Sequence, residues 1–112
     1  MQPVAQTPRA PYYAVIFTSV RSAAAAAGYA ATADRMLELA AGQPGFLGVE
    51  SVRDGEGVGI TVSYWASLEA IGNWKKHGEH RVAQELGRTA WYNEYRLRVC
   101  RVERDEHFLV TP

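Results

Sequence analysis

The stretch FLGVESVRDGEGVGITVSYW, residues 46–65, indicates two β-strands joined by a tight turn. The cluster DGEG at 54–57 has the aspartate and glycine content of a hairpin turn. Residues 46–53 before it form the second strand of the predicted fold. After the turn the side chains alternate between the two faces of a third strand, with Ile60, Val62 and Tyr64 on one face and Thr61, Ser63 and Trp65 on the other.

Upstream of this hairpin, the chain changes from a strand pattern to a helix pattern. Residues 12–20 carry β-branched and aromatic side chains on both parities, which is typical of a central strand covered on both faces. From Tyr29 onward the apolar residues follow one helical stripe, at Tyr29, Ala33, Met36, Leu37 and Ala40. Gly42 ends this helix, and the Pro44-Gly45 pair prevents its return.

Downstream of the hairpin, the sequence predicts two short helices and a long final strand. Ser67 is a suitable N-cap for a helix over residues 68–78. A second helix is expected over 79–90, and a strand over 92–104. Within that strand the apolar side chains change parity after Val99, which predicts either a bulge or a change in the surface that the strand contacts.

The predicted order is strand, helix, strand, strand, helical region, strand. This is an α+β, ferredoxin-like βαββαβ arrangement, with a four-stranded antiparallel sheet and helices on one face. We expect one domain over residues 12–104, a flexible N-terminal arm over 1–11 and a C-terminal tail over 105–112. Because several strands are apolar on both faces, the face without helices also needs a cover. A symmetric homodimer would supply that cover.

The composition indicates a globular protein of a reducing compartment. Twelve Lys and Arg residues balance twelve Asp and Glu residues, and a net charge of zero argues against nucleic acid or an anionic membrane as the partner. No apolar segment of the sequence reaches the roughly 18 residues of a membrane span. The single cysteine, Cys100, excludes an intrachain disulfide. We therefore expect a cytoplasmic protein.

Several blocks of the sequence resemble the antibiotic biosynthesis monooxygenase (ABM) family, in order along residues 12–104. They are QPGFLGVES at 43–51, SYW at 63–65, WKKHGEH at 74–80, AQ at 83–84, GR at 87–88 and WY at 91–92. The resemblance implies a dimeric α+β barrel with a pocket between the sheet and the helices of each subunit. Members of the family include cofactor-free oxygenases of polycyclic aromatic substrates and haem-degrading enzymes.

The haem-degrading branch of that family needs three residues that can be sought in this sequence. It uses an asparagine on the first strand, a tryptophan on the second helix and a histidine about nine residues later. Trp74 matches the tryptophan, but Ala83 stands at the histidine position. Ile16 or Phe17 stands near the asparagine position. Haem degradation of that kind is therefore not expected.

The aromatic-polyketide oxygenase branch matches this sequence at Trp65, the tryptophan that ends the third strand. Thr61 and Ile71 occupy the positions of that branch's asparagine and tyrosine. The resemblance still implies an aromatic pocket wall that binds the substrate. The candidate residues of this wall are Phe17, Tyr64, Trp65, Trp74 and Tyr95. The alternative interpretation is that these rings form the core and the dimer interface.

His77 and His80 are the candidate catalytic residues. They lie three positions apart, on one side of a helix or across a helix junction. A cofactor-free oxygenase needs a base that takes a proton from a phenol or an activated carbon, and the pKa of histidine suits this role. The alternative is a junction in which both imidazoles cap carbonyl groups or pair with Glu79. Because the spacing differs from that of a zinc-binding helix, no metal site is expected. The cofactor-free oxygenase interpretation likewise implies no other cofactor.

Two functions remain open at this point. The first is a cofactor-independent monooxygenase, an oxidoreductase that oxidises a small aromatic or quinol-type substrate with O₂, with Arg96 steadying the substrate anion. The alternative for Arg96 is an ion pair with a glutamate such as Glu94. The second function is a non-catalytic, homodimeric ligand-binding or stress-related domain, because a fold does not determine its function.

Overall fold

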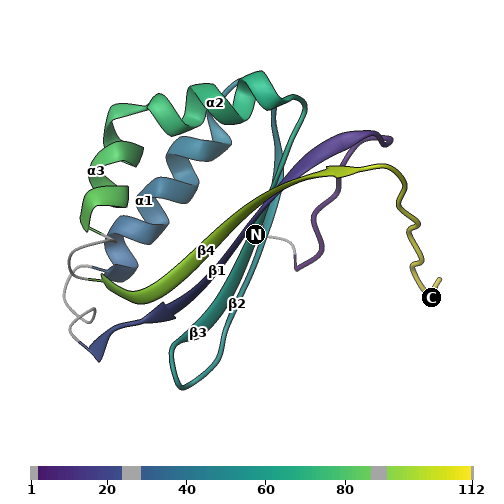
Figure 1. Ribbon diagram of the computed structural model, residues 1–112. Helices are drawn as coiled ribbons and strands as arrows, with labels where there is room; N and C mark the ends of the chain where they lie inside the picture. Colours follow the sequence, from purple (N-terminus) through teal and green to yellow (C-terminus); the bar gives the residue numbers. More distant parts are fainter. Residues whose placement is uncertain (1–2, 24–28, 87–90, 112) are drawn as a thin grey trace.

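The computed structural model describes residues 3–23, 29–86 and 91–111, which form one antiparallel sheet with helices packed on one face (Figure 1). The elements are β1 (Tyr12–Arg21), α1 (Tyr29–Ala41), β2 (Phe46–Arg53), β3 (Val58–Trp65), α2 (Leu68–Lys76), α3 (Gly78–Leu86) and β4 (Tyr92–Val102). The strands lie side by side in the order β2-β3-β1-β4. The predicted ferredoxin-like βαββαβ fold is therefore confirmed, while the end predicted for the last helix, Ala90, lies outside the described residues.

The hairpin between β2 and β3 forms where the DGEG cluster predicts it. The side chain of Asp54 accepts hydrogen bonds from the backbone N–H groups of Glu56 and Val58, both at 2.9 Å. Gly57 has a φ of 93°, in the left-handed region that glycine adopts without steric cost. These local contacts fix the register in which Ser51 pairs with Thr61.

The pairing of β1 with β4 corrects one expectation. The register runs without a shift from Tyr12 opposite Val102 to Val20 opposite Glu94, and the irregularity lies at Val20/Arg21 instead. Of the two alternatives predicted for the parity change beyond Val99, the bulge is therefore wrong. The strand itself is regular, and the apolar side chains change the face that they occupy. Up to Val99, which lies opposite Val15, they are on the helix side of the sheet, whereas Cys100 lies opposite Ala14 on the other face.

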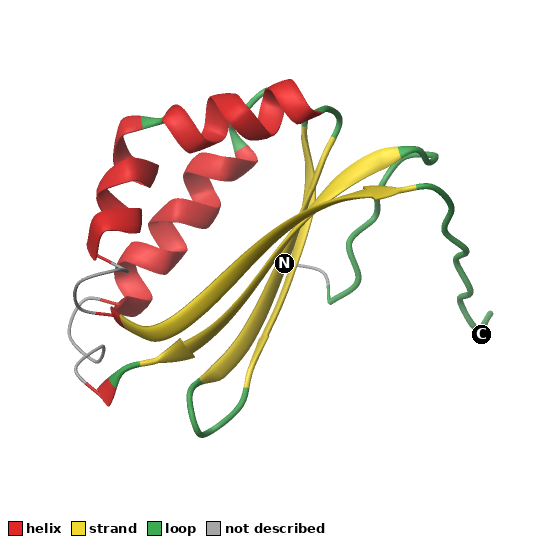
Figure 2. Ribbon diagram, in the orientation of Figure 1, coloured by secondary structure: helices red, strands yellow, loops and turns green. Residues whose placement is uncertain are grey.

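The helices form one layer over the sheet (Figure 2). The core lies between the two layers, where residues of α1 and α2 pack on β3. Helix α2 begins at the N-cap Ser67, whose side chain accepts a hydrogen bond from the Ala70 N–H at 3.1 Å. Its buried face meets the end of β3. The buried core cluster consists of Ala40, Trp65, Ala70, Ile71 and Trp74. Within the described ranges, no helix is long and apolar enough to span a membrane.

The opposite face of the sheet, which we call the outer face, carries none of the helices that the structure describes (Figure 1). Val52, Val58 and Ile60 have exposed fractions of 76%, 42% and 47%. Val52 and Ile60 are cross-strand partners, so their side chains share that face. A contiguous exposed apolar surface of this kind marks an interaction site in a soluble domain.

Candidate functional site

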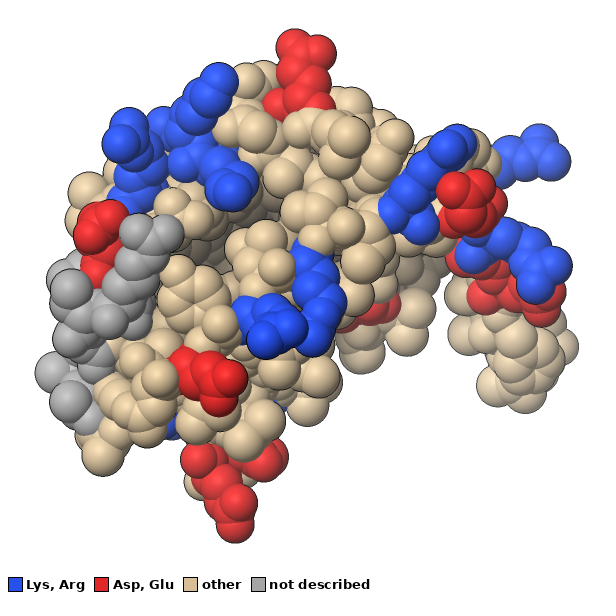
Figure 3. Space-filling view, viewed as in Figure 1, with Lys and Arg blue, Asp and Glu red and all other residues tan. Residues whose placement is uncertain are grey.

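A cavity of about 450 Å³ lies between the helices and the sheet. The space-filling view shows a hollow at this place, with lysine and arginine side chains gathered over α2 and α3 beside it (Figure 3). The cavity is bounded by β1, β2, β3 and β4 below and by α1, α2 and α3 above. Its size is within the range of small-molecule sites.

Aromatic rings form both ends of the cavity. At one end the Trp65 and Trp74 rings stack with centroids 6.3 Å apart, and Phe46 meets Trp65 edge-on at 5.4 Å. Trp65 is fully buried, and its indole N–H donates to the hydroxyl of Ser63 at 2.9 Å. At the other end Phe17 lies 5.2 Å from Tyr95, centroid to centroid. Flat ligands fit between such rings because aromatic faces and edges attract one another.

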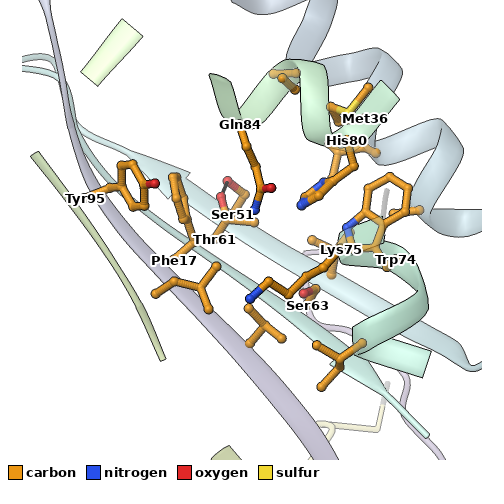
Figure 4. A pocket seen from close by; sticks show the side chains of 18 of the residues that line it. Phe17, Met36, Ser51, Thr61, Ser63, Trp74, Lys75, His80, Gln84 and Tyr95 are labelled. Carbon is orange, nitrogen blue, oxygen red and sulfur yellow. Dashed lines mark hydrogen bonds between the residues drawn. The ribbon is translucent and has the colours of Figure 1, made fainter. Parts of the chain in front are cut away.

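A band of polar side chains crosses the middle of the cavity (Figure 4). Ser51, Thr61 and Ser63 line it from the sheet, where the hydroxyl groups of Ser51 and Thr61 hydrogen-bond at 2.7 Å. Lys75, His80 and Gln84 line it from α2 and α3. An apolar pocket with a few convergent polar groups is the usual form of a site that binds and orients a small molecule.

His80 is the titratable ring in this band. Its imidazole packs against Trp74 with the ring centroids 4.5 Å apart. Burial, and then the charges of His77 and Lys75, lower the pKa of His80 to about 4. The imidazole is therefore neutral near pH 7, so a ring nitrogen is free to accept a proton from a bound molecule, and the lowered pKa makes it a weaker base than an ordinary histidine.

His77 occupies a different environment at the junction of α2 and α3. It is the C-cap of α2, and its backbone N–H donates to the Trp74 carbonyl at 3.1 Å. Its imidazole does not line the cavity, and its Nδ1 is buried without a hydrogen-bond partner among the described residues. Glu79, the partner considered for the histidines, instead forms an exposed ion pair with Arg35 at 3.4 Å.

Tyr64 and Arg96, which the sequence suggested as substrate-binding residues, lie on the outer face, away from the cavity. The Tyr64 hydroxyl donates to Glu50, and burial followed by this carboxylate raises the pKa of Tyr64. Arg96 lies opposite Thr18 and borders a separate shallow hollow on the sheet. The cavity thus brings together five of the suggested residues, namely Phe17, Trp65, Trp74, His80 and Tyr95.

Sequence reasoning missed most of the polar band. Ser51 and Ser63 could have been found, because each is on the same face of the hairpin as Trp65. Lys75 and Gln84 carried no comparable signal, since charged and amide residues on a helix are usually solvated. In the part of the chain that the structure describes, no group of three or more His, Cys, Asp or Glu residues is placed to hold a metal ion.

Comparisons with known proteins agree with this architecture. The family model described as "Antibiotic biosynthesis monooxygenase" matches residues 11–86. An uncharacterized protein of Bacillus subtilis, YqjZ, is 56% identical over 105 residues, which cover 94% of this chain and 91% of that protein.

Solved structures show the same fold at low sequence identity. Rv0793 from Mycobacterium tuberculosis has a TM-score of 0.73 and 15% identity, covering 87% of this chain and 98% of its own. SnoaB from Streptomyces nogalater, a cofactor-independent oxygenase, has a TM-score of 0.64 and 15% identity, covering 80% of this chain and 90% of its own.

Proposed function

Because this chain belongs to the antibiotic biosynthesis monooxygenase family, we propose that it is a monooxygenase acting in the cavity between sheet and helices. The substrate is a small aromatic or quinol-type molecule, and O₂ is the oxidant, without flavin or metal. The observation that carries the proposal is the placement of His80, a neutral imidazole packed on Trp74 in the wall of an aromatic cavity.

The reaction begins with a proton transfer to His80. The neutral imidazole takes a proton from a phenol hydroxyl or from an activated CH₂ carbon of the substrate, which leaves an electron-rich anion whose reacting carbon still carries one hydrogen. This anion transfers one electron to O₂, and the resulting radical and superoxide combine to form a C–O bond as a peroxide anion. The proton held by His80 returns to that anion. Loss of water from the hydroperoxide then leaves a carbonyl, so one oxygen atom stays in the product and the other leaves as water.

The aromatic walls hold the substrate in position for this chemistry. Trp65 and Trp74 contact one end of the ring system, and Phe17 and Tyr95 contact the other. Holding the reacting carbon beside the base replaces a bimolecular encounter by an oriented contact, which lowers the barrier. Tyr64 and Arg96 have no part in this proposal, because they lie on the outer face.

We further propose that two copies of the chain associate through their outer faces in the cytoplasm. The proposal is supported by the exposed, cross-strand apolar residues Val52 and Ile60, which a second copy would cover. Membership of the family also supports it, since a dimeric barrel needs two such sheets facing each other.

The proposed location in the cytoplasm is supported by Cys100. Its thiol, which forms no disulfide, fits a reducing compartment.

The substitution Ile60→Asp is expected to convert the dimer into a monomer. A carboxylate at this position of the outer face would be buried in the dimer without a partner, at a cost of several kcal/mol per subunit. Sedimentation velocity at micromolar concentration would measure the change. Leu68→Asp is the control, because Leu68 is also exposed (57%) but lies at the start of α2. A wild-type protein that sediments as a folded monomer would refute the dimer.

The monooxygenase function is tested by oxygen uptake with the wild-type protein. A panel of hydroquinones, naphthols and anthrone-like tricyclic compounds would be added in an oxygen electrode, with heat-unfolded protein as the blank. We expect uptake of one O₂ per substrate, and transfer of one ¹⁸O atom from labelled O₂ into the product. If no compound gives uptake above the blank while some of them bind, the non-catalytic ligand-binding function would be favoured instead.

A further inference from the structure

Two adjacent lysines end helix α2, and only one of them faces the cavity. Lys75 and Lys76 both belong to the last turn of α2, but only Lys75 lines the cavity. Successive residues of a helix point about 100° apart, so the two lysines leave α2 in different directions. Lys75 lines the cavity together with the buried Trp74, and Lys76 does not. The side chain of Lys75 extends from the helix into the space that His80 and Gln84 also enter (Figure 4).

The described side chains that line the sheet side of the polar band, across the cavity from Lys75, are hydroxyls and not carboxylates. Ser51, Thr61 and Ser63 line the sheet side of the polar band. A hydroxyl can accept a hydrogen bond from an ammonium group but does not neutralise its charge. Lys75 is exposed along part of its length, so it keeps its hydration when the cavity is empty.

The remaining charges in the cavity lining also favour an anion. Among the described lining residues, Lys75 and Arg53 are positive and Asp34, on the exposed side of α1, is negative. Arg53 is the last residue of β2, next to the β2–β3 turn. There its guanidinium donates to the Gly57 carbonyl and to the Ser19 hydroxyl. His80 adds no positive charge near pH 7, because burial and its neighbours keep its imidazole neutral.

We propose that the cavity selects aromatic ligands that carry a negative charge, a carboxylate or a phenolate, and that Lys75 binds that charge. The inference deepens the proposed function and rests on it in one respect, namely that the cavity is the substrate site. The rings of the ligand lie between the aromatic ends, and its anionic group lies in the polar band beside Lys75. The same ammonium would stabilise the anion formed when His80 removes a proton from the substrate.

The inference is tested with a matched pair of probes, 2-naphthoate and 2-naphthamide. Both have the same ring body and nearly the same shape, but only the first is charged. Dissociation constants would be measured by isothermal titration calorimetry near pH 7 for the wild-type protein, Lys75→Met and Lys76→Met. We expect the wild-type protein and Lys76→Met to bind 2-naphthoate about tenfold more tightly than 2-naphthamide, and Lys75→Met to lose most of that preference. A preference of this size is expected from a charge-assisted hydrogen bond that is partly open to solvent.

Three results would overturn the inference. They are equal affinities of the wild-type protein for the two probes, an unchanged preference in Lys75→Met, and failure of both probes to bind. The oxygen-uptake assay separates these failures from failure of the proposed function. Naphthoate selectivity without oxygen uptake would leave the anion site standing and reject the monooxygenase. Oxygen uptake that is unaffected by Lys75→Met would leave the monooxygenase standing and reject Lys75 as the group that binds the anion of the substrate.

Discussion

The substitution His80→Gln is expected to lower kcat for substrate-dependent oxygen uptake by roughly 100-fold or more, which is the usual contribution of a positioned general base. Glutamine keeps much of the size of the imidazole and its contact with Trp74, but it cannot accept a proton at neutral pH. The measurement is oxygen uptake at saturating substrate. KM should change much less than kcat, because the side chain acts on the proton and not mainly on binding.

The matched comparison is His77→Gln. His77 lies next to Trp74, with ring centroids 5.5 Å apart, but outside the cavity, so we expect this variant to lose less than about tenfold in kcat. Equal losses in the two variants would show that the histidines act through the packing of Trp74. A large loss in His77→Gln alone would assign the base to His77.

The pH dependence gives a second readout of the same assignment. With a pKa of about 4, His80 of the free enzyme is already neutral at pH 6. For a substrate that does not titrate in this range, kcat/KM should be flat from about pH 6 to about pH 8. An ordinary histidine base would instead give a rise centred near pH 6.5. Such a rise would contradict His80 as the base.

The substitution Gly45→Ala is expected to lower the free energy of unfolding by about 3 kcal/mol. Gly45 has a φ of 86°, and a Cβ added there would lie 2.6 Å from the Cβ of Ala70. The left-handed backbone costs an alanine roughly 1–2 kcal/mol, and overpacking costs about 1–3 kcal/mol. The Gly45 carbonyl also accepts the Ala66 N–H at 2.7 Å, so the chain cannot move away without losing that contact.

Urea denaturation followed by tryptophan fluorescence would measure this loss. The control is Gly55→Ala in the β2–β3 turn, where an added Cβ meets nothing within 4 Å and where φ is not positive. We expect that variant to change the unfolding free energy by less than about 1 kcal/mol. Comparable losses in the two variants would show that the contact with Ala70 contributes little. Since Ala70 and Trp74 belong to one core cluster, Gly45→Ala should also perturb the cavity wall.

Local patterns were sufficient to predict the elements of this fold. The DGEG turn and the alternation after it predicted β2 and β3, and the structure places β2 at Phe46–Arg53 and β3 at Val58–Trp65. Ser67 predicted the start of α2, which it caps. These features depend on contacts within a few residues, so they can be read from short stretches of sequence.

The site depended on contacts that the sequence does not encode locally. Alternation places Tyr64 and Trp65 on opposite faces, but it does not say which face meets the helices. Likewise, helical spacing does not show that His80 enters the cavity while His77 caps α2, nor that Lys75 and not Lys76 faces the aromatic walls.

By itself, the sequence determined the order and type of the elements and the family, because short-range periodicity and turn chemistry decide them. Only the tertiary structure decided which side of the sheet is covered and which polar side chains meet above it. Both features depend on how α1, α2 and α3 pack on strand residues that are far away in the chain. The free energy of burying apolar surface depends on the assembled structure, so it cannot be read from the local pattern of the sequence.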